Sequence, residues 1–206
     1  FDGKEVYIIN PDGADNGAVS VSLSDIATKA QVNNTIHVDV PATYSSPDSP
    51  PPYMVGMVEI ELDKETGAVK ILDYQAVVDC GIPVNPNLAR VQTEGGIGQG
   101  IGMALYENVT YNAGGKIAEN DFMQYKIPTR QDVGHINVEF ETSYEPSGPF
   151  GVKSIGEIVI NTPAPALAHA IYRATGVWHR TVPFTPEKIL MGMADPDWHE
   201  KDLRVK

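Results

Sequence analysis

The chain has 206 residues, and its 27 acidic side chains outnumber the 15 basic ones to give a formal net charge of −12 at pH 7. That length is enough for one domain, or two small ones, with a buried core. The acidic balance argues against nucleic acid and anionic membranes as partners, because both require a basic surface on the protein. No apolar run approaches the roughly 20 residues of a membrane span.

Cysteine usage and the first residues add further expectations. Cys80 is the single cysteine, so the chain has no internal disulfide and cannot by itself hold an iron–sulfur cluster. The polar start, Phe1–Glu5, lacks the apolar stretch of a signal peptide, so we expect a cytoplasmic protein. Because residue 1 is Phe and not Met, we also expect the sequence to have been cut or to begin elsewhere.

The first segment predicts two short strands joined by a turn. Residues 6–9 are apolar and β-forming, and residues 19–21 begin a second strand. Asn10-Pro11-Asp12-Gly13 is a turn of the Pro-Asp-Gly kind.

A short helix and a proline-rich connection are expected next. Ser22, followed three residues later by Asp25, is a variant of the capping box and predicts a helix to about residue 30. Residues 32–40 are expected to be extended. The prolines of 45–52 remove backbone donors, so this segment is a connection, either a passive linker or an arm on a partner subunit.

Residues 53–79 predict a β-hairpin. Apolar Val58, Ile60 and Leu62 alternate with acidic residues, and Thr66-Gly67 makes the turn. Alternation of this kind marks a sheet with one face in water, so the glutamates on that face are expected to be solvated.

The segment 91–105 has the length of a helix but carries five glycines. Each glycine inside a helix costs about 1 kcal/mol relative to alanine, so close approach to a cofactor or to a neighbouring helix must offset the cost. The glycines at 96, 98, 100 and 102 alternate and do not satisfy the GxGxxG pattern, which excludes a dinucleotide-binding motif.

Three shorter features lie between this segment and residue 140. Residues 106–117 predict a polar strand and turn with Gly114-Gly115 at the tip, and Pro128 is expected to end an element. Residues 136–140 alternate as a strand.

The stretch 148–157, Gly-Pro-Phe-Gly-Val-Lys-Ser-Ile-Gly-Glu, predicts a glycine-rich turn that closes on a carboxylate. Apolar residues flank Glu157 in sequence, and a carboxylate in such surroundings has a raised pKa and can act as a base. The alternative is a loop whose Glu157 faces water.

A helix is predicted over 163–175. Asn161 or Thr162 can cap it, Pro163 suits its first position, and Gly176 stops it. Its N-terminus is expected to point toward the Glu157 loop, where free N–H groups favour negative charge. His169 and His179 are predicted to be surface or capping residues and not metal ligands.

Several of these motifs resemble those of one family. The 148–157 stretch, followed by a helix and Thr185-Pro186-Glu187-Lys188-Ile189-Leu190, resembles the carboxy-terminal signature of the molybdenum hydroxylases, which include xanthine dehydrogenase and aldehyde oxidase. Residues 92–100 resemble the family's Gln-x-Glu-Gly-(x)3-Gln-Gly element, and 125–128 its Tyr-Lys-Ile-Pro. The resemblance covers 1–206 as the C-terminal portion of the molybdopterin-binding domain, most strongly over 55–191.

The resemblance implies a set of site residues. Glu157 matches the family's catalytic base, which activates the hydroxyl on molybdenum. Gln92 and Gln99 match the two glutamines of the family element and are assigned to the cofactor. Ser154, Ile155 and Gly156 are assigned to it as well, and no side chain is assigned as a metal ligand.

The implied function is hydroxylation of a purine or related N-heterocycle, with water as the oxygen source. The implied cofactor is a molybdenum-pyranopterin, in the simple or the cytosine dinucleotide form. Iron–sulfur clusters and FAD are expected only on partner subunits or domains, together with an upstream molybdopterin-binding portion. Aldehyde oxidation and a non-catalytic role in assembly are the rival functions.

The fold class that we predict is α+β. Antiparallel hairpins are expected to carry the glycine-rich helix and the apolar C-terminal helix on one side. The sequence does not identify the substrate, the electron acceptor, or the sulfido or selenido ligand of the molybdenum.

Overall fold

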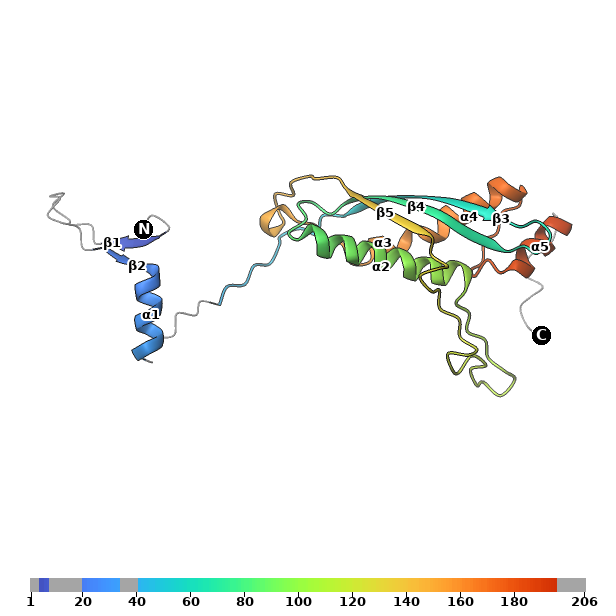
Figure 1. Cartoon of the computed structure of the whole chain (residues 1–206), viewed down its shortest axis with the longest axis horizontal. Coiled ribbons are helices and arrows are strands. Elements are labelled where there is room, and N and C mark those ends of the chain that lie inside the picture. The colour runs from blue at the N-terminus through green and yellow to red at the C-terminus, as the bar shows by residue number, and fades with distance from the viewer. Residues whose placement is uncertain (1–3, 8–19, 34–40, 196–206) are drawn as a thin grey trace. The chain divides into compact units, whose positions relative to one another are not determined.

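The computed structural model describes residues 4–7, 20–33 and 41–195, and the chain divides into two compact units, 1–45 and 46–206 (Figure 1). In the first unit, β1 (Glu5–Tyr7) pairs antiparallel with β2 (Ser20–Ser22). Both strands were predicted from the sequence. The predicted turn at 10–13 lies outside the described residues.

The helix α1 (Leu23–Asn33) follows directly on β2. The Asp25 N–H donates to Ser22 Oγ over 3.0 Å, and the Ser22 hydroxyl donates to the Asp25 carboxylate over 2.8 Å, which confirms the predicted cap. The helix continues through Val32, so the extended segment predicted from that residue is wrong there. Residues 34–40 lie outside the described part of the chain.

The proline-rich segment 45–52 contains neither helix nor strand, as predicted for a connection. Ser46, the first residue of the second unit, donates through its Oγ to the Ser147 carbonyl of the same unit over 2.8 Å.

A three-stranded sheet, in the order β3-β4-β5, organises the second unit. β3 (Tyr53–Leu62) and β4 (Val69–Asp79) form the predicted hairpin, with Gly67 at φ 72° in the turn. β5 (His135–Phe140) runs parallel to β4, whereas only antiparallel pairing was expected. Parallel neighbours need a long crossover, which α2 (Pro86–Leu105) supplies between these strands.

One face of the sheet packs against the helices (Figure 1). α2, α4 (Pro163–Thr175) and α5 (Pro186–Ala194) contribute to a single core with β4 and β5. Its most deeply buried members are Tyr74, Val78, Ile97, Ile101, Val138, Leu167, Ile171 and Ile189. The α+β class, with both predicted helices on one side of the sheet, is confirmed.

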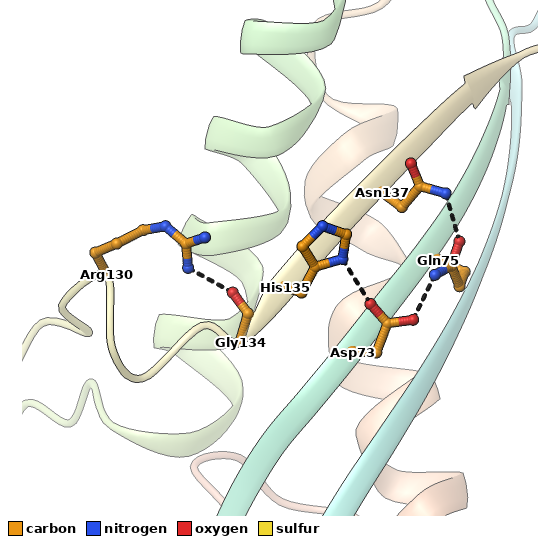
Figure 2. Close-up of polar contacts among 6 residues, drawn as sticks. All are labelled: Asp73, Gln75, Arg130, Gly134, His135 and Asn137. Atoms are coloured by element: carbon orange, nitrogen blue, oxygen red, sulfur yellow. Dashed lines mark hydrogen bonds and ion pairs between the residues drawn. The ribbon is translucent and has the colours of Figure 1, made fainter.

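The other face of the sheet is exposed, and a ladder of polar side chains crosses it (Figure 2). His135 Nδ1 lies 2.9 Å from Asp73 Oδ1, Gln75 Nε2 donates to the other Asp73 oxygen, and Asn137 Nδ2 donates to Gln75 Oε1 over 2.9 Å. Glu59 and Glu61 are exposed too, which confirms that the acidic residues of the hairpin face water.

The helix termini show which caps the sequence identified. Pro163 is the first residue of α4, and Gly176 ends it in the left-handed conformation at φ 79°, both as predicted. Thr162 does not cap α4. Its hydroxyl instead accepts a hydrogen bond of 3.0 Å from the buried Tyr74 hydroxyl.

Candidate functional site

The glycine-rich stretch 148–157 forms a loop that is fastened to the end of β4. It opens with the 3₁₀ turn η1 (Pro149–Gly151), in which Phe150 has φ 57° and is 85% exposed. The Ile82 N–H donates to the Gly151 carbonyl over 2.9 Å, and the Lys153 N–H donates to the Cys80 carbonyl over 2.7 Å. These two bonds hold the first half of the loop beside the strand end.

A half-buried ion pair reinforces this attachment. Lys153 Nζ donates to Asp79 Oδ2 over 2.7 Å, and the two side chains are only 10% and 20% exposed. The other carboxylate oxygen accepts from Ser143 Oγ at 2.6 Å and from the Gly81 N–H at 3.1 Å. Lys153, Ser143 and Gly81, in that order, hold the pKa of Asp79 below its ordinary value.

Glu157 follows at the exposed end of the loop, immediately before the one-turn helix α3 (Ile158–Asn161). Ile155 packs against the hydrophobic core, and Ile158 is half-buried. The apolar neighbours of Glu157 in sequence therefore do not shield it within this chain. The helix that begins beside Glu157 is α3 and not α4, contrary to our expectation.

Gln92 of α2 lies against the same loop. Its Nε2 makes a long hydrogen bond of 3.5 Å to the Gly156 carbonyl, although 64 residues separate the two positions. Gln92, Ser154, Gly156 and Glu157 are all exposed there. The structure thus brings together the predicted site residues from α2 and from the loop.

Gln99 lies farther along α2. It is exposed like Gln92, and the separation of seven positions corresponds to about two helical turns, or roughly 10 Å along the helix. Gly95 lies between them on this exposed face and has no heavy atom within 4 Å of where a Cβ would be. Gln99 therefore shares the surface of Gln92 but not its contact with the loop.

Four of the five glycines of α2 divide into two groups. A Cβ at Gly96 would lie 2.1 Å from Val159 Cγ2, and one at Gly100 would lie 2.7 Å from Pro163 Cγ. Close packing against α3 and α4 therefore accounts for these two glycines. A Cβ at Gly98 would meet its nearest neighbour, Val133 Cγ1, only at 4.0 Å, so the tight packing that we expected at this position is wrong.

The side chains that could ligate a metal lie apart from one another. Among residues 4–7, 20–33 and 41–195, no group of three or more His, Cys, Asp or Glu is placed to hold an ion. His169 is exposed, whereas His179 is 3% exposed and packs near Phe184 and Gly192. His179 is therefore buried, so the surface position predicted for it is wrong, while the capping role given as the alternative stays a prediction. Cys80 is buried, and burial raises the pKa of its thiol.

The exposed surface around Gln92 suits a polar organic group that binds by hydrogen bonds. It offers the amides of Gln92 and Gln99, the hydroxyl of Ser154 and exposed loop backbone. Gly95 and Gly98 leave open space above the helix, so a flat group could approach the backbone closely. The residues present fit a pterin of the kind that the motifs suggested.

Comparison with known protein families decides the affiliation. A family described as "Molybdopterin cofactor-binding domain" matches residues 3–134. The chain belongs to the molybdenum hydroxylase family. It carries the α+β fold of the family's molybdopterin-binding domains, and the family's members are molybdenum-dependent oxidoreductases.

The relatives of this molybdenum hydroxylase chain differ in their named substrates. It is 38% identical over 178 residues to "Probable hypoxanthine oxidase XdhD" of Escherichia coli K12, covering 84% of this chain and 18% of the relative. It is 39% identical over 141 residues to "6-hydroxypseudooxynicotine dehydrogenase complex subunit gamma" of Paenarthrobacter nicotinovorans, covering 67% and 18%.

The chain is also similar to a solved structure. Quinoline 2-oxidoreductase from Pseudomonas putida 86 is similar at 34% identity and a TM-score of 0.64, over 67% of this chain and 18% of that one. The chain therefore spans about a fifth of the length of the relatives it matches. Among the described residues, no helix has both the length and the apolarity to cross a bilayer.

Proposed function

We propose that this chain is the C-terminal portion of the molybdopterin-binding region of a hydroxylase acting on a purine or related N-heterocycle, with Glu157 as its catalytic base. The observation that carries the proposal is the contact between Gln92 and the Glu157 loop, 3.5 Å from Nε2 to the Gly156 carbonyl. Two motifs far apart in sequence thereby form one exposed surface. The names of XdhD and of quinoline 2-oxidoreductase support a nitrogen heterocycle as the substrate class.

Residues from α2 and from the Glu157 loop each contribute to binding the cofactor. Gln92 and Gln99 bind the polar edges of the cofactor through their amides, and Ser154 adds a hydroxyl beside the backbone of Ile155 and Gly156. These groups are neutral, so they hold the cofactor without basic side chains on a chain of net charge −12. When bound, the molybdenum cofactor supplies two-electron redox chemistry and oxygen transfer, with water as the oxygen source.

Glu157 accepts a proton during the reaction. Its carboxylate must be ionised for that task, and it must lie within hydrogen-bond reach of the proton it removes. The short α3 and the anchored loop fix its backbone from both sides. Positioned proton transfer of this kind contributes about 10²–10⁴-fold to a rate.

The rest of the enzyme is supplied by other parts of the assembly. An upstream portion completes the cofactor site and selects the substrate, and iron–sulfur and flavin subunits carry the electrons away. The printed name of the Paenarthrobacter relative, a subunit of a dehydrogenase complex, supports such an assembly. We place the enzyme in the cytoplasm and in purine metabolism.

The test is metal and pterin analysis of the chain purified with and without its upstream portion, followed by turnover of the complete assembly. We expect molybdenum only in the assembly, and activity on hypoxanthine or xanthine exceeding that on nicotinate and on an aldehyde. Higher activity on the aldehyde than on the purines would contradict heterocycle hydroxylation and support aldehyde oxidation. If no assembly contained molybdenum, the hydroxylase function would be excluded and the non-catalytic role in assembly would be favoured.

A further inference from the structure

Lys153 is unusual among the residues of the Glu157 loop because its charged end is paired in a half-buried position. Its side chain is 10% exposed, and Nζ lies 2.7 Å from Asp79 Oδ2 and 5.5 Å from the centre of the Tyr53 ring. Removing a Lys–Asp pair from water carries a desolvation cost that attraction between the charges offsets only in good geometry. Such a pair is weak evidence for added stability, so its role is to be sought in the geometry that it fixes.

Asp79 provides Lys153 with a rigid anchor. It is the last residue of β4, the central strand of the sheet, and it pairs with Tyr53 of β3. Its second carboxylate oxygen is held by the Ser143 hydroxyl at 2.6 Å and the Gly81 N–H at 3.1 Å. The carboxylate therefore has one orientation in which all three donors are satisfied, and Lys153 is fixed to the sheet through it.

Glu157 lies between two such attachments. Lys153, four residues before it, is bound to Asp79 by its side chain and to the Cys80 carbonyl by its N–H at 2.7 Å. Val159, two residues after it, packs against Gly96 of α2. Between these attachments, Ser154 and Gly156 are exposed, and the bond that Gly156 accepts from Gln92 is long at 3.5 Å.

We infer that Lys153, through its ion pair with Asp79, is a positioning residue that sets the place of the Glu157 carboxylate. The inference rests on the proposed function of Glu157. Loss of the pair weakens the attachment of the loop on its N-terminal side, where only the backbone hydrogen bonds to Ile82 and Cys80 described above remain, while α3 still holds it on the other. A catalytic group displaced by about 1 Å loses up to 10²-fold in rate, even when its own chemistry is unchanged.

The experiment uses the complete enzyme with Lys153→Met, which keeps the length of the side chain and removes its charge. We expect kcat to fall by about 10–100-fold, with KM within threefold and the molybdenum content unchanged. Hydrogen exchange of the backbone amides at 154–158 should become faster. Lys153→Arg, which keeps the charge and can still reach Asp79, should restore most of kcat and the slow exchange.

A cycle with Asp79→Asn tests the pair directly. If Lys153 acts through Asp79, the double variant should be no slower than the worse single variant. Ser143→Ala, which removes one bond to the Asp79 carboxylate, should lower kcat in the same direction by a smaller factor. It serves as the milder variant if Lys153→Met does not assemble.

Unchanged kcat in both Lys153→Met and Ser143→Ala would overturn the inference. So would a loss of kcat matched by loss of molybdenum, because that outcome assigns Lys153 a structural role only. Glu157→Gln, assayed in parallel, separates this inference from the proposed function. If Glu157→Gln turns over normally, the proposed function fails, while the exchange rates at 154–158 still report whether Lys153 holds the loop.

Discussion

Gly96 of α2 lies so close to Val159 of α3 that a Cβ at position 96 would come within 2.1 Å of Val159 Cγ2. Val159 is buried, and it stands two residues after Glu157. The contact therefore joins the glycine-rich helix to the segment that carries the proposed base. It also explains why a glycine is present at a helix position where alanine would be favoured by about 1 kcal/mol.

Gly96→Ala is expected to destabilise the protein, because the new methyl group overlaps Val159 and the backbone of α3 must move. Overpacking of this kind costs about 1–3 kcal/mol. The measurement is the urea midpoint of the variant against the original protein. Gly95→Ala is the matched control, since nothing lies within 4 Å of its Cβ position, and it should be neutral or stabilising by up to about 1 kcal/mol. Equal effects at both positions would contradict the packing account.

The α2 glycines also show what could and could not be predicted from the sequence. Their number predicted a close approach, but not to which partner, because the helical face that each occupies depends on where α3 and α4 lie. The structure assigns Gly96 and Gly100 to helix packing and leaves Gly95 and Gly98 open. The number of glycines in the segment does not distinguish the packed pair from the open pair.

Local patterns predicted the β3–β4 hairpin and the limits of α4 because alternation, Pro163 and Gly176 act over a few residues. The parallel pairing of β5 was not predictable, since alternation carries no information on strand direction. Asp79 and Lys153 are 74 residues apart, and no spacing rule joins them. The sequence left two positions open for Glu157, among apolar side chains or facing water. The structure has the second, because Ile155 packs against the core and Glu157 is exposed.

The buried Tyr74–Thr162 hydrogen bond offers a second test of the core. Tyr74 is 0% exposed, and its hydroxyl donates to Thr162 Oγ1 over 3.0 Å. Tyr74→Phe should lower the free energy of unfolding by about 0.5–1.5 kcal/mol. In a double-mutant cycle with Thr162→Val, measured by urea unfolding, the effects should not add. Strict additivity would show that the two hydroxyls do not interact.

The ladder on the outer face of the sheet should make stability depend on pH (Figure 2). The hydrogen bond from Gln75, and then that from His135, hold the pKa of Asp73 below its ordinary value of 3.8. A carboxyl whose pKa is lowered by folding stabilises the protein above its ordinary pKa, and the contribution is lost as the pH falls through the lowered value.

Asp73→Asn should therefore reduce stability near neutral pH and flatten its decline below about pH 4. Urea unfolding of the variant and the original protein between neutral and acidic pH measures this. The stabilities of the two proteins should converge at the acidic end. A constant difference over the whole range would show that Asp73 does not titrate differently on folding.

Gln92 is expected to act on the cofactor and not on the fold. Its side chain is exposed, and its one bond to Gly156 is long at 3.5 Å, so Gln92→Ala should change the stability of the chain little. In the complete enzyme the same substitution should reduce molybdopterin content or turnover, because an amide donor to the cofactor is lost. The pterin content, the molybdenum content and kcat of the variant should be measured and compared with those of the original enzyme. Full occupancy with an unchanged rate would count against the role.

The most direct test of the central claim is turnover of the complete enzyme carrying Glu157→Gln. Glutamine keeps the size of the side chain and removes its basicity, so packing and proton transfer are separated. We predict that kcat falls at least about 10²-fold while the molybdenum and pterin contents stay unchanged. A Glu157→Gln enzyme with full cofactor and near-normal turnover would contradict the assignment of Glu157 as the base.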